Sequence, residues 1–251
     1  MIEIKNYSKG ISYLVDAEDQ LSAVLKLIEN GTNLEGVNLG GVDFRGVDFR
    51  GANLRNADFN GANLEGANFE NTNLKGASFK GAVLDGANFY GANLVGAIFD
   101  DTSLRGADLS DAVLYGASLK GAILESAVSR NADFDSADLE SANFYGADLR
   151  GAIFYRANLK NAYLNNADFT GANVNGADFR GASLDSASWP LSCQSLYTKI
   201  DDKVRIQLLY HAARPSGDVV DEDLKKLLNL ELFKRVANKF HKIPKFCGKI
   251  Y

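Results

Sequence analysis

From Thr32 to Leu191 the chain repeats one five-residue pattern without an insertion or deletion. The centres of these units fall on every fifth residue from Leu34 to Trp189, and 29 of the 32 are Leu or Phe. Two residues before the centre, 26 of the 32 units have Ala. A period of five matches neither the roughly 3.6 residues of a helical turn nor the alternation of an ordinary strand. The backbone must therefore turn once per unit.

Glycine marks the expected turns. Of the 24 Gly in the chain, 19 lie two residues after a centre. Gly adopts a positive φ at little steric cost, as many tight turns require. We therefore expect a corner at each of these positions. The centre and the small residue two before it should point inward from a short strand, while the other three positions point outward.

The order of the centres limits the number of sides in each coil. From Phe49 to Phe99, Phe and Leu alternate strictly. Like residues then stack on like only if a coil has an even number of sides, and four sides leave a core wide enough for them. Between Phe99 and Phe134 the alternation shifts by one unit, and Ser129 is a centre in this interval. The sequence leaves two interpretations of Ser129 open: a local kink or binding notch, and a tolerated packing defect or buried water.

The repeat units resemble a known family. Residues 52–56 (ANLRN) and 57–61 (ADFNG) are similar to the A(D/N)LxG-type units of the pentapeptide-repeat family, and the resemblance covers 160 of 251 residues. It implies an all-β solenoid, a right-handed quadrilateral β-helix, here of about eight coils and roughly 38 Å long. Some quinolone-resistance members look like B-DNA in shape and charge and bind type II topoisomerases, so the resemblance also implies a DNA-mimicking gyrase binder as one function.

Residues 1–31 precede the repeat and predict an N-terminal capping segment. Extended pieces are expected at Met1–Ile4 and Ile11–Val15, followed by a helix over Ala17–Glu29 with Asp16 as its N-cap. The expected apolar face of this helix is Leu21, Val24, Leu25 and Ile28. The open end of a β-helix exposes unpaired strand edges, so we expect this segment to cover the first coil.

Residues 192–251 follow the repeat and predict a helical C-terminal cap, with dimerisation as a further expected role. Helices are expected over 201–213 and within 221–240. All Cys and His of the chain lie here: Cys193, His211, His241 and Cys247. Two Cys and two His could hold zinc, but no C-x2-C or H-x3-H pair is present, which favours ordinary satisfied or surface side chains. No cofactor or metal is therefore expected.

The net charge of −5 hides a gradient along the chain. Residues 32–191 carry 12 basic and 20 acidic side chains, a net of −8, whereas 192–251 carry 12 basic and 7 acidic ones. Duplex DNA of the same length carries roughly 22 negative charges, which weakens the DNA-mimic interpretation. The basic end fits a solvated helix face, with an acidic partner or nucleic acid as the less favoured alternative.

No apolar run approaches the roughly 20 residues of a membrane span. The first ten residues also lack the basic region and apolar core of a signal peptide. The sequence therefore predicts a cytoplasmic protein.

Outward residues that recur every twenty positions should form columns on each side. One column alternates in charge and is typical of a solvated ladder: Lys80, Asp100, Lys120, Glu140, Lys160 and Arg180. The first side, that of Leu34 and Leu54, is instead apolar over several coils, at Val95, Val113, Tyr115, Ile153 and Tyr155. The third side has a weaker version of the same patch, at Val83, Ile123, Tyr145 and Tyr163. An exposed apolar patch predicts a partner or dimer surface, with scattered apolar residues or cover by the C-terminal segment as alternatives.

Three functions follow from these observations. The first is a non-catalytic scaffold that binds a protein partner or a second copy of itself. The second is the topoisomerase binder that the resemblance implies. The third, an enzyme, is the least favoured, because a filled β-helix offers no pocket where polar groups converge. The resemblance implies end-to-end homodimers, whereas a patch on the first side implies side-by-side ones.

Overall fold

The structure is a computed structural model that describes residues 1–6, 9–188, 198 and 200–201. Trp189, the expected C-terminal helices and all four Cys and His residues lie outside the described residues.

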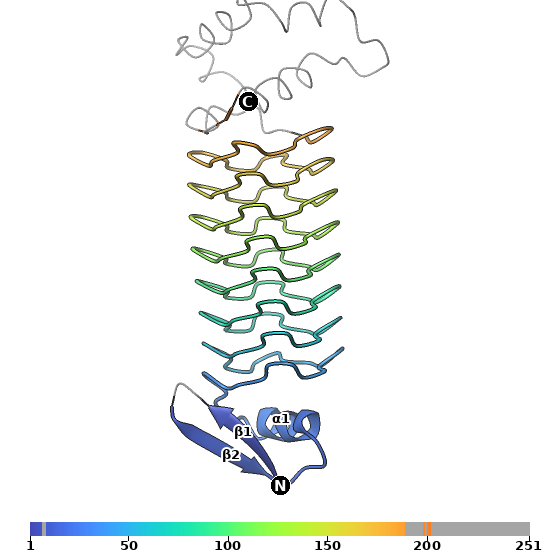
Figure 1. The fold of residues 1–251 in the computed structure, drawn as a ribbon, viewed down its shortest axis with the longest axis vertical. Coiled ribbons are helices and arrows are strands. Elements are labelled where there is room, and N and C mark those ends of the chain that lie inside the picture. The colour runs from blue at the N-terminus through green and yellow to red at the C-terminus, as the bar shows by residue number, and fades with distance from the viewer. Residues whose placement is uncertain (7–8, 189–197, 199, 202–251) are drawn as a thin grey trace, which may run out of the picture.

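The repeat forms a β-helix whose coils stack along one axis (Figure 1). Parallel bridges join residues twenty positions apart, from Asn38↔Asp58 to Asp168↔Ser188. Each side adds short backbone bonds to the next coil, as where the Phe59 N–H donates to the Ser78 carbonyl over 2.7 Å. Because the chain turns every fifth residue, a spacing of twenty gives four sides per coil, as the sequence predicts.

The corners lie where the sequence predicts them. All 19 Gly that follow a centre by two residues have a positive φ, as at Gly36 (71°) and Gly181 (77°). Asn, Asp, Ser and one Arg occupy the other corners among the described residues, and these twelve have φ between 53° and 60°. Asn and Asp tolerate this left-handed backbone, whereas Arg156 (φ 56°) holds it without such an advantage.

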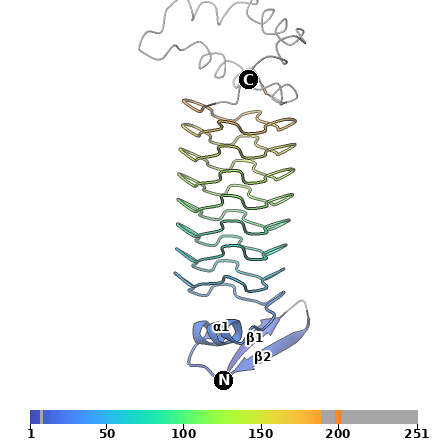
Figure 2. The ribbon, with the colours of Figure 1, turned by 180° about the vertical axis from the view of Figure 1, so that it is seen from behind.

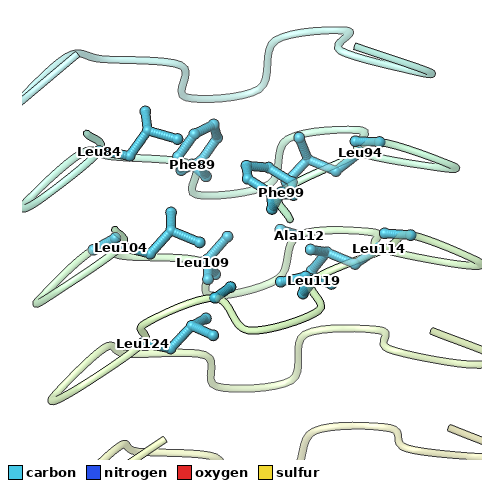
Figure 3. Packing of buried hydrophobic residues seen from close by; sticks show 14 of the residues in the cluster. Leu84, Phe89, Leu94, Phe99, Leu104, Leu109, Ala112, Leu114, Leu119 and Leu124 are labelled. Atoms are coloured by element: carbon cyan, nitrogen blue, oxygen red, sulfur yellow. The ribbon is translucent and has the colours of Figure 1, made fainter. Parts of the chain in front are cut away.

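The centres fill the interior and stack like on like. Phe49 lies over Phe69 with ring centroids 4.9 Å apart, and Phe134 lies over Phe154 at 5.0 Å. Between these stacks the core is built from leucines, as Figure 3 shows for the coils around Leu104 to Leu124. Every described centre is buried, so the inward positions are those that the sequence predicts.

Ser129 is fully buried, and its Oγ has no hydrogen-bond partner in the part of the chain that the structure describes. The backbone ladder continues past it, since the Ser129 N–H donates to the Asp148 carbonyl over 2.8 Å. Val128 is bridged to both neighbouring coils, through Asp108 and Asp148. The continuous ladder and the full burial of Ser129 argue against a kink or a surface notch, and leave a packing defect and a buried water as the interpretations of this position.

The N-terminal segment lies at one end of the stack (Figures 1 and 2). Strands β1 (Ile2–Asn6) and β2 (Ile11–Val15) form an antiparallel hairpin, followed by helix α1 (Gln20–Glu29). The hairpin joins the coils through β1, because the Asn38 N–H donates to the Lys5 carbonyl over 2.8 Å. No helix of the described residues is both long and apolar enough to cross a membrane.

Helix α1 starts later than the sequence predicts. Its N-cap is Asp19, not Asp16, because the Asp19 carboxylate accepts the Ser22 N–H over 2.7 Å. The predicted apolar face is confirmed at Val24, which is buried, and at Leu21 and Ile28, which are partly buried against the core. Ala23, Val24 and Leu27 are buried, whereas the predicted Leu25 is 36% exposed. Two apolar stripes overlap in this helix, and only its docking decides which stripe meets the core.

Candidate binding surface

Where Asp or Asn stands before a centre, its side chain closes a small turn with the backbone two residues on. Asp58 Oδ1 accepts the Asn60 N–H over 2.9 Å, and Asp108 Oδ1 accepts the Ser110 N–H over 2.9 Å. The same bond joins Asn93 Oδ1 to the Val95 N–H at 3.2 Å. Sequence reasoning placed these residues outward and missed this role, although the preference for Asp and Asn at the position was its signal.

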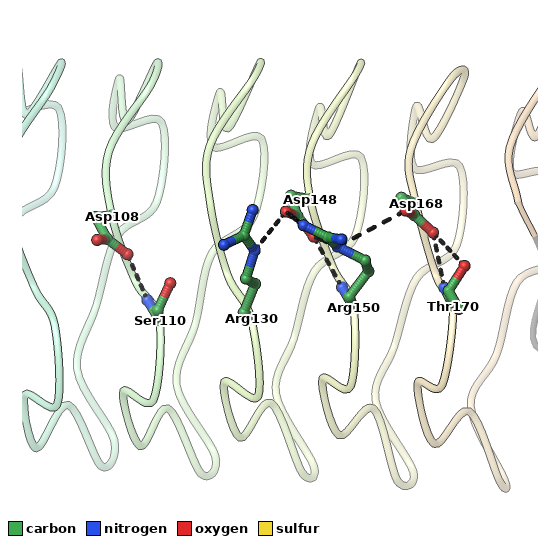
Figure 4. Close-up of polar contacts among 7 residues, drawn as sticks. All are labelled: Asp108, Ser110, Arg130, Asp148, Arg150, Asp168 and Thr170. Carbon is green, nitrogen blue, oxygen red and sulfur yellow. Dashed lines mark hydrogen bonds and ion pairs between the residues drawn. The ribbon is translucent and has the colours of Figure 1, made fainter.

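The same coils carry two outer surfaces of different character. The apolar face consists of Val95, Val113, Tyr115, Asp133, Asp135, Ile153 and Tyr155. The ladder face, drawn in Figure 4, consists of Asp108, Ser110, Arg130, Asp148, Arg150, Asp168 and Thr170.

All five residues of the predicted patch lie on the apolar face. Tyr115 is 50% exposed, Val113 38% and Ile153 37%. The other two, Val95 and Tyr155, are half-buried. The patch therefore presents apolar side chains to solvent from several stacked coils.

Two carboxylates that the sequence-based patch did not include divide the apolar face. Bridges place Asp133 between Val113 and Ile153. Asp135 lies in the same coil as Asp133 and donates its N–H to Asp133 Oδ1 over 2.9 Å. Within the described residues, neither carboxylate forms an ion pair. Along the axis of the stack, this face therefore has apolar side chains, then acidic ones, then apolar ones again.

An apolar residue before the centre removes the side-chain acceptor from the turn. Where Ser stands there, the preceding coil supplies one, as Asn60 Oδ1 does for the Lys80 N–H at 2.9 Å. Tyr115 has neither source, because Val113 precedes its centre and Val95 occupies the matching position of the preceding coil. No side chain of the described residues accepts the Tyr115 N–H, so this exposed residue offers a donor beside its ring.

The ladder face satisfies its charges internally. Arg130 Nε lies 2.6 Å from Asp148, and Arg150 Nη2 lies 2.7 Å from the same carboxylate. Arg150 also reaches Asp168 at 3.8 Å, so the contacts run across three coils (Figure 4). Hydrogen bonding from Arg150, together with that from Arg130, holds the pKa of Asp148 far below its usual range.

Profiles described as pentapeptide repeats match residues 30–66, 62–101, 99–128 and 139–188, together more than half of the chain. The chain belongs to the pentapeptide-repeat family.

Two solved structures of QnrB1 resemble the chain in fold. A trypsin-treated variant of QnrB1, described as a plasmid-mediated fluoroquinolone resistance protein, is 22% identical, with a TM-score of 0.58 over 72% of this chain and 97% of that one. Full-length QnrB1 is 17% identical, with a TM-score of 0.50 over 69% and 98%. HetL, involved in heterocyst differentiation regulation in Nostoc sp. strain PCC 7120, is 25% identical over 72% and 95%, with a TM-score of 0.33. A search of curated proteins found no match.

The described part of this pentapeptide-repeat protein holds no cluster of three or more His, Cys, Asp or Glu side chains suited to a metal ion. The candidate zinc ligands Cys193, His211, His241 and Cys247 lie outside it. An open depression between α1 and the coils is lined by Asp19, Gln20, Leu21, Val42, Asp43 and Arg45. Its charged groups already bond to neighbours, Asp19 to the Ser22 N–H and Arg45 to Asp43. The apolar face is therefore the stronger candidate surface.

Proposed function

We propose that this pentapeptide-repeat protein is a non-catalytic scaffold whose apolar face binds a protein partner or a second copy of the chain. The carrying observation is the exposure of Val113, Tyr115 and Ile153 on one side of a regular stack. The backbone ladder holds these side chains at fixed spacing, so binding costs little ordering of the scaffold. Burying an exposed side chain of this size contributes at most about 1.5–3 kcal/mol.

Affinity capture from an extract of the native cell tests this proposal. The wild-type chain is compared with Tyr115→Asp/Tyr155→Asp, which places two charges in the apolar face. Tyr145→Asp/Tyr163→Asp is the matched control, because these tyrosines are 51% and 57% exposed on a different side. We expect the first variant to lose a partner that the wild type and the control both retain. Retention of every partner by the first variant would refute the proposal.

A second candidate function is inhibition or protection of a type II topoisomerase by mimicry of DNA. The acidic excess of the repeat, 12 basic against 20 acidic side chains, favours it. Pairing of carboxylates with Arg on the ladder face, as at Asp148, weakens it because the surface field is reduced. A gyrase supercoiling assay tests this candidate function. If the protein neither inhibits gyrase nor protects it from a quinolone, the candidate is refuted.

We further propose a division of the chain into three parts. Residues 1–31 cap the first coil, 32–191 form about eight right-handed coils, and 192–251 form a helical cap that can also dimerise. The burial of Ala23, Val24 and Leu27 against the core supports the first assignment. Light scattering after size exclusion tests the last one, since a chain truncated after residue 191 should lose any dimer that this part makes.

A further inference from the structure

The order of side chains along the apolar face carries information about what binds there. Three consecutive coils present Val113 with Tyr115, then Asp133 with Asp135, then Ile153 with Tyr155. Bridges Val113↔Asp133 and Asp133↔Ile153 show that these coils are direct neighbours. A ligand that matches all three must present apolar, cationic and apolar groups at the spacing of the coils.

The spacing favours a helix over an extended segment. Neighbouring coils lie about 4.8 Å apart, so the two apolar rows are about 10 Å apart. An α-helix rises about 5.4 Å per turn, and two turns cover about 11 Å. An extended strand presents the same side only every 6.6 Å or so, and two such steps overshoot the rows by about 3 Å. A helix lying parallel to the stack therefore meets each coil with one turn.

The two carboxylates in the middle of the apolar face favour a basic residue in the middle turn of that helix. Asp133 and Asp135 form no ion pair with any residue that the structure describes, whereas Asp148 on the ladder face already contacts two Arg side chains. A Lys or Arg from a ligand would complete the apolar face, and a carboxylate or phosphate would be repelled.

We infer that the apolar face binds an amphipathic helix of a partner protein, with apolar residues at i and i+7 and Lys or Arg at i+3 or i+4. The helix lies along the stack, its apolar turns against Val113/Tyr115 and Ile153/Tyr155 and its cation over Asp133/Asp135. This inference rests on the proposed function, because it specifies the ligand of the same face.

Selection from a displayed library tests the inference. The library holds helix-forming peptides of about 18 residues in which one face is randomised, together with extended, Pro-containing peptides as competitors. The full chain is the bait, and binders that also bind Tyr115→Asp/Tyr155→Asp are discarded. We expect the remaining binders to be helical and to carry the apolar, basic, apolar pattern.

Charge removal is the second arm of the test. In Asp133→Asn/Asp135→Asn the amide oxygens can still accept the N–H of residue 135 and the Ser136 hydroxyl, which the two carboxylates accept in the wild type, so only charge is lost. We expect the selected peptides to bind this variant at least about tenfold more weakly. Asp58→Asn/Asp108→Asn is the matched control, because both carboxylates accept a backbone N–H two residues on and lie on other sides. It should leave binding unchanged.

Several outcomes would overturn the inference. These are selected peptides without a basic middle turn, extended peptides among the binders, unchanged binding by Asp133→Asn/Asp135→Asn, or no binder that depends on the two tyrosines. A face occupied by a second copy would bind no peptide and show a doubled mass by light scattering, which also overturns it. If capture from the extract still depends on Tyr115 and Tyr155 in these cases, the proposed function stands and only the inference fails.

Discussion

The apolar face and the ladder face are built on the same coils and the same backbone bonds, yet they differ in whether their outward carboxylates form ion pairs. On the ladder face, Asp148 is held by Arg130 and Arg150 at 2.6 and 2.7 Å. On the apolar face, Asp133 and Asp135 have no such contact among the described residues, and Tyr115 is half exposed. The core and the backbone bonds determine the fold. The outward side chains can therefore either bond to one another or remain exposed to a partner. Among the described residues, the apolar face is the one whose two carboxylates lack an ion pair and whose Tyr115 N–H lacks a side-chain acceptor.

The largest expected effect comes from converting the apolar face into an ordinary one. Val113→Asn/Ile153→Asn should restore the side-chain turn, as Asn93 makes it to the Val95 N–H. Folding stability should stay within about 0.5 kcal/mol, since both positions face outward. Affinity for a captured partner should fall about 30- to 100-fold, because two apolar contacts are lost. Titration calorimetry measures the affinity. Unchanged affinity would contradict the proposed difference between the two faces in partner binding.

A smaller effect is expected in the core behind the ladder face, where Ser129 lies between Leu109 and Leu149 of the neighbouring coils. Ser129→Leu should raise the free energy of unfolding by about 2 kcal/mol, because it fills the interior and removes an unpartnered hydroxyl. Ser129→Ala removes only the hydroxyl and should gain about 1 kcal/mol. Urea melts followed by circular dichroism measure both. Destabilisation by Ser129→Ala would show that the hydroxyl has an unseen partner, such as water.

Removing one carboxylate from each face should change the free energy of unfolding by unequal amounts. Asp148→Asn loses two ion pairs and should cost about 1 kcal/mol, a value reduced by solvent because both Arg side chains are about half exposed. Asp133→Asn loses no described ion pair and keeps its acceptor, so its stability should not change measurably. Equal costs at the two positions would contradict the contrast between the faces.

The pH dependence of Asp148 is the smallest expected effect. Its pKa is lowered in the folded chain, so its contribution to stability is complete above the unfolded pKa of about 4. This contribution should disappear as the pH falls from about 4 towards the lowered pKa. The stability difference between wild type and Asp148→Asn should therefore shrink below about pH 4. A difference that grows on acidification would have the wrong sign for this ion-pair network.

The regular part of the molecule could be predicted from the sequence because one rule acts at every unit. Inward Leu and Phe, corner Gly and like-on-like stacking all follow from the five-residue period, and the structure bears them out. The start of α1 could not be predicted in the same way, because Asp16 and Asp19 are both acceptable caps and docking decides between them. The five apolar residues of the candidate surface could be placed on one side by counting. The interruption by Asp133 and Asp135 follows from the same count, since they lie twenty residues after Val113 and Tyr115, whereas the pairing of Asp148 with two Arg side chains depends on side-chain geometry.

Hydrogen exchange measured with and without the captured partner shows which face of the β-helix the partner covers. The Tyr115 N–H has no side-chain acceptor among the described residues, whereas the Ser110 N–H on the ladder face is bonded to Asp108 at 2.9 Å. We expect the partner to slow exchange at Tyr115 and Tyr155 and to leave Ser110 and Thr170 unchanged. Protection confined to the ladder face, with none on the apolar face, would contradict this expectation.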